Sequence, residues 1–296
     1  MTTLINLNFQ NTQKVIAAFL IKGKEGYVLV ETGPHSSWPS LQSSLGELGV
    51  DLKEIKGILV THIHLDHSGG VWQLAKSGIP CYVHPIGRPH LVDPNKLYNS
   101  AAKIYGQENM EKLWGKVDTI DPALVHAIED NQEFSIAGVK IKPFYTPGHA
   151  SHHIVYAIEG QLFSGDLLGV RIEKGPIIVQ APPPELDVEL WLDSIKRIRK
   201  HKFDRLMMTH FGIVEKNVEE HYDKMEQALH SAKDWMKKSL ETGKADEEIF
   251  RMWEEETKDA IRKKGGDEEL IHQYITANPP FMSVSGFKRY LSKLEK

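Results

Sequence analysis

Four side chains of metal-binding types stand within six residues of one stretch of this chain. His62, His64, Asp66 and His67 follow directly after the apolar run at residues 57–60. In an extended segment alternate side chains share a face, so the first three can point to one side. His67 breaks this alternation, which fits a turn into a helix. Imidazole and carboxylate groups suit zinc and its neighbours, so the stretch predicts a metal site at the end of a strand.

Three later motifs carry further residues of the same types. They are Thr146-Pro147-Gly148-His149, Ser164-Gly165-Asp166 and Thr209-His210-Phe211-Gly212. Histidine pairs arise by chance in a chain with 15 histidines, but four such motifs in order are hard to explain that way. Over about residues 4–215 the motifs resemble those of the metallo-β-lactamase superfamily. The resemblance implies an α/β fold, the αβ/βα sandwich, with a metal pair at one edge. It is strongest to a hydrolase-like branch related to glyoxalase II and lactonases.

The resemblance also implies a set of ligands for two divalent ions. Seven residues fall at the family's positions: His62, His64 and His149 for one ion, Asp66, His67 and His210 for the other, and Asp166 as the bridge. Zinc is the first expectation, and iron or manganese suit the same side chains. Such a pair lowers the pKa of a bridging water from 15.7 to about 7, which supplies hydroxide. Asp66 is also expected to act in catalysis by guiding a proton to the leaving group. The implied reaction is hydrolysis of a small ester-like substrate, such as a thioester, lactone or phosphoester.

Two more residues are expected just outside the ligand set. Glu31 begins a Glu-Thr-Gly tripeptide where the family usually has Asp-Thr-Gly, and the alternative is an acid at a strand end with no role in the site. His153 is expected to donate to a ligand or a backbone group. His152 replaces a glycine of glyoxalase II- and lactonase-like relatives, and is either a substrate contact or a surface histidine. His84 and His90 are not expected to be ligands, and no substrate-binding residue is predicted.

Apolar strands must bring these motifs to one edge. Each ligand group follows a candidate strand, at residues 58–60, 139–145, 161–164 and 205–209. Because α/β sheets tend to place sites at the carboxyl ends of strands, the four ends are expected to meet. Strands are also predicted within residues 4–31. A helix near 69–77 and a strand at 81–84 complete a β-α-β unit. Cys81, the single cysteine, is predicted to be a small buried residue of that strand.

Two segments lie outside this strand pattern. Residues 85–118 are predicted as an insertion with a proline-rich opening and two short helices, at 97–105 and 108–114. Together with the proline-rich segment 169–184, the insertion is a candidate for the wall of a substrate pocket, and a purely structural role is the alternative.

The chain is predicted to divide after residue 215. Residues 1–215 form the metallo-β-lactamase-type domain, and residues 216–296 form a helical C-terminal extension that packs on it and either closes the site or contributes to a dimer contact. Asp187 is a candidate N-cap for an earlier helix, whose face of Val188, Trp191 and Ile195 is expected to pack in the core.

Composition limits the remaining choices. Hydrophobic residues make up 41% and charged residues 26%, which is typical of a globular chain, and the net charge of −4 argues against a nucleic-acid partner. The start of the chain does not resemble a signal peptide, and no 18-residue apolar run occurs, so a cytoplasmic protein without a membrane partner is expected. The expected partner is a small-molecule substrate, and a homodimer is left open.

The sequence favours hydrolysis of a small substrate over other functions of the same fold. A true β-lactamase is disfavoured because Asp166 stands where several such enzymes have cysteine, and because no export signal is seen. A nuclease is disfavoured by the charge. Flavodiiron proteins use glutamate where His64 stands. An iron-dependent oxidoreductase of the persulfide dioxygenase type is the main alternative, and a metal-binding protein without turnover is the third.

Overall fold

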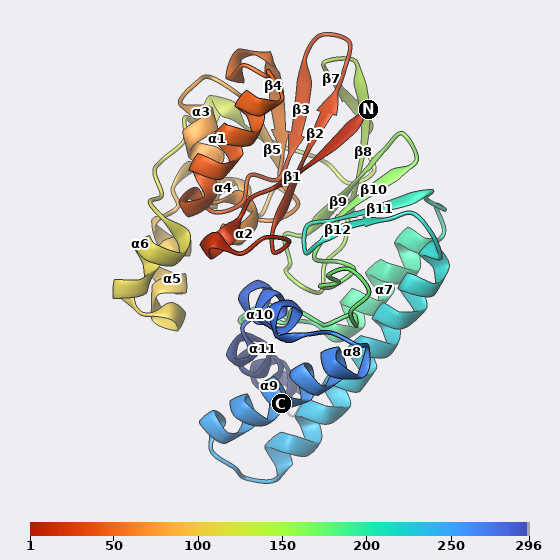
Figure 1. The fold of residues 1–296 in the computed structure, drawn as a ribbon. Coiled ribbons are helices and arrows are strands. Elements are labelled where there is room, and N and C mark those ends of the chain that lie inside the picture. Colours follow the sequence, from red (N-terminus) through yellow and green to blue (C-terminus); the bar gives the residue numbers. More distant parts are fainter. Residues whose placement is uncertain (295–296) are drawn as a thin grey trace.

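The computed structural model describes residues 1–294 and contains two six-stranded sheets in face-to-face layers (Figure 1). The first sheet follows chain order: β1 (Thr2–Asn6), β2 (Ala17–Lys22), β3 (Tyr27–Val30), β4 (Ile55–Leu59), β5 (Cys81–Val83) and β6 (Val125–Ala127). Its first three strands pair antiparallel, and the pairs from β3 to β6 are parallel. Cys81 is a buried free thiol in β5, as predicted.

The second sheet also keeps neighbouring strands of the chain together. Its strands are β7 (Phe134–Ile136), β8 (Val139–Tyr145), β9 (Ile154–Ile158), β10 (Gln161–Gly165), β11 (Arg205–Met208) and β12 (Gly212–Val214). All its pairs are antiparallel except β10 with β11. A parallel pair needs a crossover, and α7 (Val188–Arg199) lies in it.

Strand β2 shows why its sequence is a continuous apolar run. Phe19 and Ile21 pack in the cluster between the two sheets, whereas Ala18 and Leu20 pack in the cluster beneath the outer helices. Both faces of the strand are therefore buried, which removes the polar alternation of a half-exposed strand.

Helices cover the outer face of each sheet. On the first sheet these are α1 (Trp38–Glu47), α2 (Leu65–Ser68), α3 (Val71–Ala75) and α4 (Arg88–Val92). On the second they are α7 and the start of the C-terminal helices. This arrangement confirms the predicted αβ/βα sandwich. The predicted helix near 69–77 is present as the shorter α3, whereas α2, which directly precedes it, and α4 were not predicted as helices.

The insertion and the C-terminal region supply the other helices, which lie at the same end of the sandwich (Figure 1). The insertion contains α5 (Asn95–Tyr105) and α6 (Gln107–Trp114), close to the two predicted helices. The C-terminal helices are α8 (Val218–Glu241), α9 (Asp246–Lys263), α10 (Glu268–Ala277) and α11 (Pro280–Leu294). The last two residues of the predicted extension, 295 and 296, lie outside the described part. Within residues 1–294, no helix has both the length and the apolar character to cross a membrane.

Candidate metal centre

The loop after β4 presents the first group of polar side chains. His62 and His64 lie in the loop, and His64 precedes the first turn of α2, which carries Asp66 and His67. The turn into a helix that the parity break predicted is therefore present. Thr61 O accepts a hydrogen bond from Ile154 N, which ties the loop to β9 of the second sheet.

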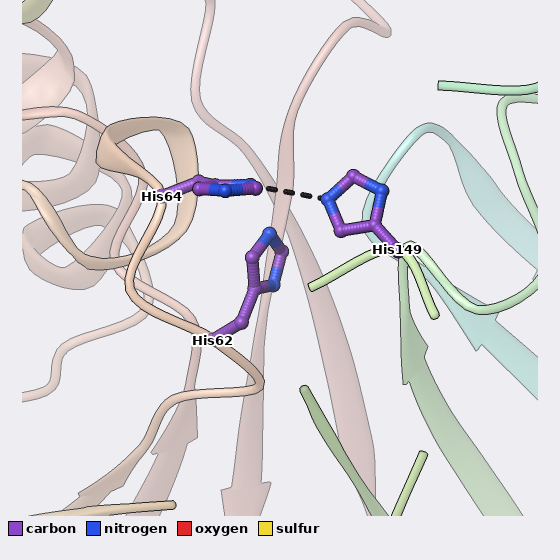
Figure 2. A group of neighbouring side chains, drawn as sticks. All are labelled: His62, His64 and His149. Carbon is purple, nitrogen blue, oxygen red and sulfur yellow. Dashed lines mark hydrogen bonds between the residues drawn. The ribbon is translucent and has the colours of Figure 1, made fainter. Parts of the chain in front are cut away.

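His149 joins His62 and His64 from the other sheet. The possible ligand atoms of these three residues all lie within 4.8 Å of one another. Figure 2 shows the three rings converging, with His64 Nδ1 and His149 Nε2 3.1 Å apart. Next to His149, Gly148 at φ +138° lets the chain pass close to α7, since a Cβ atom there would lie 2.3 Å from the Trp191 Cα atom.

Asp66, His67 and His210 form a second group with the same spacing. Their possible ligand atoms also lie within 4.8 Å of one another. Asp66 Oδ2 is 3.4 Å from His210 Nε2 and 3.6 Å from His67 Nε2.

Asp166, at the end of β10, lies between the two groups. Its Oδ2 atom is 3.3 Å from His149 Nε2 and 3.9 Å from His62 Nε2. Its Oδ1 atom is 3.2 Å from His67 Nε2 and 3.6 Å from His210 Nε2. One carboxylate thus presents a different oxygen to each group.

The buried polar atoms of this cluster fit the presence of cations. His62 Nε2, His67 Nε2, His210 Nε2 and Asp166 Oδ1 are all buried and have no hydrogen-bond partner. An unpaired buried polar group is costly, and four such atoms directed into one space are unusual in a folded protein. Because imidazole nitrogens and carboxylate oxygens are ligands for divalent transition metals, bound ions would satisfy all four.

The family model described as the metallo-beta-lactamase superfamily matches residues 12–210. The chain belongs to this superfamily. This membership confirms the resemblance that the four motifs indicated.

Among three relatives of this chain, two have names that state an enzyme activity. The metallo-beta-lactamase fold-containing protein ST1585 of Sulfurisphaera tokodaii is 27% identical over 223 residues, which are 72% of this chain and 79% of that protein. A hydroxyacylglutathione hydrolase of Vibrio cholerae is 31% identical over 114 residues, 38% of this chain and 33% of that protein. An atrochrysone carboxyl ACP thioesterase of Aspergillus fumigatus is 26% identical over 175 residues, 58% of this chain and 43% of that protein. This chain therefore matches less than half the length of either enzyme.

Among solved structures, the metallo-beta-lactamase family protein TTHA1429 of Thermus thermophilus superposes with a TM-score of 0.68 at 20% identity. The match covers 99% of this chain and 94% of that one, so the similarity in fold includes the C-terminal helices.

Two histidines of the cluster are oriented by hydrogen bonds that their Nδ1 atoms make to backbone carbonyls outside the cluster. His149 Nδ1 donates to Gln180 O at 2.9 Å, and His210 Nδ1 donates to Val15 O at 2.7 Å. The Nε2 atom of each ring is then the one directed to the centre, since a neutral imidazole has one donor and one acceptor nitrogen. The motifs gave no sign of either partner, because a backbone carbonyl can come from any residue type.

Glu31 lies behind His67. Its Oε1 atom is 3.2 Å from His67 Nδ1 and accepts a hydrogen bond from the Thr61 hydroxyl. Glu31 is fully buried and has φ +64°, an unusual backbone conformation for a residue other than glycine. Its position fits the expected place just outside the ligands, and one carboxylate oxygen holds two groups of the loop.

His153 lies behind Asp166 and makes a different contact from the one expected. Its Nε2 atom accepts a hydrogen bond from the Asp166 backbone N–H at 3.1 Å, and its Nδ1 atom contacts the Thr146 hydroxyl at 2.7 Å. His153 therefore accepts from the backbone next to Asp166, whereas the expected role was donation.

His152 is buried and lines the cavity beside the cluster, so it is not a surface histidine. Its Nε2 atom is 3.7 Å from Glu185 Oε2, and the same carboxylate oxygen accepts hydrogen bonds from the Ser151 backbone and hydroxyl. Glu185 was missed in the sequence because nothing in its neighbourhood resembles a site motif. His84 packs against the Tyr145 ring, and His90 lines the cavity but belongs to neither group of possible ligands.

Burial and charge set the protonation of the cluster. Burial lowers the pKa of His62 well below its ordinary value and that of His64 to about 4, so both are neutral. Burial alone would raise the pKa of Asp166, but the neighbouring His67, His149 and His210 outweigh it and hold the pKa well below the usual range. Burial alone would lower the pKa values of His67 and His210, but Asp166 and Asp66 outweigh it and raise both, that of His67 well above its ordinary value. Because metals bind neutral imidazole and ionised carboxylate, a bound ion would displace the proton from these two rings.

A cavity of about 670 Å³ opens beside the cluster. Five of the seven predicted ligands line it: His64, Asp66, His149, Asp166 and His210. The rest of its wall includes residues of the insertion, of the proline-rich segment 182–184 and of α10 and α11.

Proposed function

We propose that this protein is a metal-dependent hydrolase that holds two divalent ions and cleaves a small ester-like substrate. The position of Asp166 carries the proposal, since its two oxygens face two separate groups of three possible ligands. A carboxylate placed in this way suits a bridge between two cations. The relatives named as a hydroxyacylglutathione hydrolase and as a thioesterase support hydrolysis over other chemistry of the fold.

The proposed ligands follow the two groups. His62, His64 and His149 would hold one ion, and Asp66, His67 and His210 the other, with zinc as the first candidate. When bound, a pair of divalent ions supplies Lewis-acid polarisation of a carbonyl or phosphoryl oxygen and acidifies water. Asp166 would reduce the repulsion between the two cations, because it is ionised and buried between them.

Asp66 is the proposed proton carrier. Its side chain is 19% exposed and lines the cavity, whereas that of Asp166 is 2% exposed. A carboxylate at the cavity wall can contact both the reacting water and the leaving group, which a general acid or base must do. His67 and His210 hold its Oδ2 atom in place.

Metal content and turnover test the proposal together. Purified protein loaded with zinc should contain two ions per chain, and it should hydrolyse at least one of a panel of thioesters, lactones and aryl phosphoesters without oxygen. Chelator should abolish this turnover. Asp166→Ala should hold fewer than two ions and lose most activity with an unchanged circular dichroism spectrum.

Two outcomes would contradict the proposal. A fully loaded sample that never exceeds one ion would rule out the pair of ions. An iron-loaded sample that does not hydrolyse the panel but consumes oxygen with a persulfide would identify the iron-dependent oxidoreductase alternative instead.

A further inference from the structure

The cavity extends from the metal centre between two helical regions that lie outside the strands. We call the part of the cavity that is lined by six apolar residues the apolar chamber. These residues are Leu97, Ala101, Ile104 and Trp114 from the insertion, and Ile275 and Phe281 from α10 and α11. The ligand cluster lines the same cavity, so a molecule that reacts at the cluster can extend into the chamber without leaving it.

Helix α5 presents an apolar face to this chamber and has no fully buried residue. Leu97, Ala101 and Ile104 are spaced by four and three residues, so they share one side of the helix. Ile104 remains 36% exposed although it lines the cavity. Leu97 and Ala101 are partly buried against the core, as an apolar helix face normally is, and the rest of the face is open to the cavity. The face is about 10 Å long, from the rise of 1.5 Å per residue.

Aromatic side chains connect the two walls of the chamber. The Tyr105 ring lies edge-on to Trp114 at 5.1 Å and to Phe281 of α11 at 5.8 Å. Trp114 also stacks on Phe9 at 5.6 Å. These contacts hold the insertion, the N-terminal loop and α11 in one surface, which suits a chamber that exists before the substrate binds.

Charge in the cavity is sparse beyond the ligand cluster. Among its lining residues only Lys96 and Glu185 add a full charge. A phosphate-rich group would need several arginine or lysine donors, and one lysine does not supply them. The chamber therefore suits an uncharged apolar group.

We infer that the substrate carries an elongated aliphatic acyl group, which lies in the apolar chamber with its carbonyl at the metal centre. This inference rests on the proposed hydrolase function and names the acyl side of its substrate. In this arrangement Leu97, Ala101 and Ile104 contact the acyl group along its length. Phe281 and Ile275 contact the opposite side of the acyl group.

The test uses zinc-loaded full-length protein and a series of thioesters from acetyl to decanoyl, all with the same small uncharged thiol. Each added methylene group should raise kcat/KM roughly fourfold until the chamber is filled, because burying one methylene contributes about 0.8 kcal/mol. A kcat/KM that is flat or falls with chain length would overturn the inference.

Two matched variants locate the effect. Ile104→Glu places a carboxylate in the chamber and should lower the decanoyl-to-acetyl ratio of kcat/KM at least tenfold. Leu190→Glu is the control, since Leu190 is 48% exposed on α7 and does not line the cavity, and its ratio should equal that of the unchanged protein. An unchanged ratio in Ile104→Glu would place the acyl group elsewhere.

A binding measurement separates failure of this inference from failure of the proposed function. If no member of the panel of thioesters, lactones and aryl phosphoesters is cleaved, the hydrolase proposal fails. Calorimetric titration with acetate, hexanoate and decanoate then tests the chamber without turnover. Tighter binding of decanoate that Ile104→Glu removes would support an aliphatic occupant, and equal affinity for the three acids would overturn it.

Discussion

At the scale of single residues, the ligand cluster depends on partners that fix each imidazole ring. Gln180 O and Val15 O accept from His149 and His210, and Glu31 lies against His67. Such contacts determine which nitrogen faces a metal and how basic it is. Glu31 also accepts a hydrogen bond from the Thr61 hydroxyl, so it contacts two residues of the segment that carries the ligands.

Glu31→Gln should therefore weaken metal binding. The amide keeps the shape of the carboxylate but loses its charge, so His67 becomes a poorer ligand. We expect metal affinity to fall about 10–100-fold, the usual range for such outer contacts. Competition with a coloured chelator measures it. Glu47→Gln, at an exposed position of α1, is the control and should bind metal normally. Equal affinity in both variants would exclude a role for Glu31 in holding the ligands.

At the scale of elements, α8 is joined to the loop after β10 through a buried histidine. His221 Nε2 donates to Leu168 O at 3.1 Å. Burial, reinforced by the positive charges of Arg171 and Lys224, lowers the pKa of His221 to about 4. The folded state thus keeps this ring neutral at pH values where an unfolded chain, with a pKa of about 6.5, would protonate it.

His221 should make stability depend on pH in one direction. Because the unfolded state takes up the proton first, the contribution of His221 is complete above pH 6.5 and is lost as the pH falls towards 4. We expect His221→Gln to reduce the pH slope of the unfolding free energy in this window by up to about 1.4 kcal/mol per pH unit. Urea unfolding at several pH values measures it. Parallel slopes for both proteins would show that His221 does not titrate in this way.

Helix α11 packs closely against the proline-rich segment. A Cβ atom on Gly286 would lie 1.8 Å from Ala181 O, so the two backbone segments would have to move apart. Gly286→Ala should lower the unfolding free energy by about 1–3 kcal/mol, the usual cost of overpacking. Gly46→Ala in α1 is the matched control, because nothing lies within 4 Å of its added Cβ atom. That variant should gain up to about 1 kcal/mol, since alanine is the better helix former. Equal stabilities would mean that the contact at Gly286 relaxes freely.

At the scale of the whole molecule, the predicted boundary at residue 215 cuts through a shared core. Leu206 and Met208 of β11 belong to the same buried cluster as Tyr222 and Met225 of α8, and Phe287 of α11 is also part of it. The C-terminal helices thus cover the second sheet and supply part of the cavity wall.

A chain of residues 1–215 should fail to form a well-packed native state. Removing α8 to α11 would expose the apolar outer face of the second sheet, which costs about 25 cal/mol for each Å². We expect strong binding of a hydrophobic dye and a broad thermal transition. Dye fluorescence and calorimetry, with the full-length chain as reference, test this. A sharp transition without dye binding would show that residues 1–215 fold alone.

Much of the architecture could be predicted from the sequence alone. The apolar runs ahead of each motif indicated the strands, because strands buried on both faces are uniformly apolar. The spacing of Val188, Trp191 and Ile195 predicted α7, with Asp187 as its N-cap, and the structure has both. The seven candidate ligands were named from local motifs, and the structure places them within one cluster.

Only the tertiary structure decided what surrounds these residues. The motif positions are up to 148 residues apart between His62 and His210, so their mutual distances depend on how the two sheets face each other. The partners Gln180 O and Val15 O are backbone atoms, which carry no residue-type signal. The apolar face of α5 would suggest core packing in any sequence. That it borders a cavity shared with the ligand cluster follows from how the insertion, the N-terminal loop, α10 and α11 are placed around it.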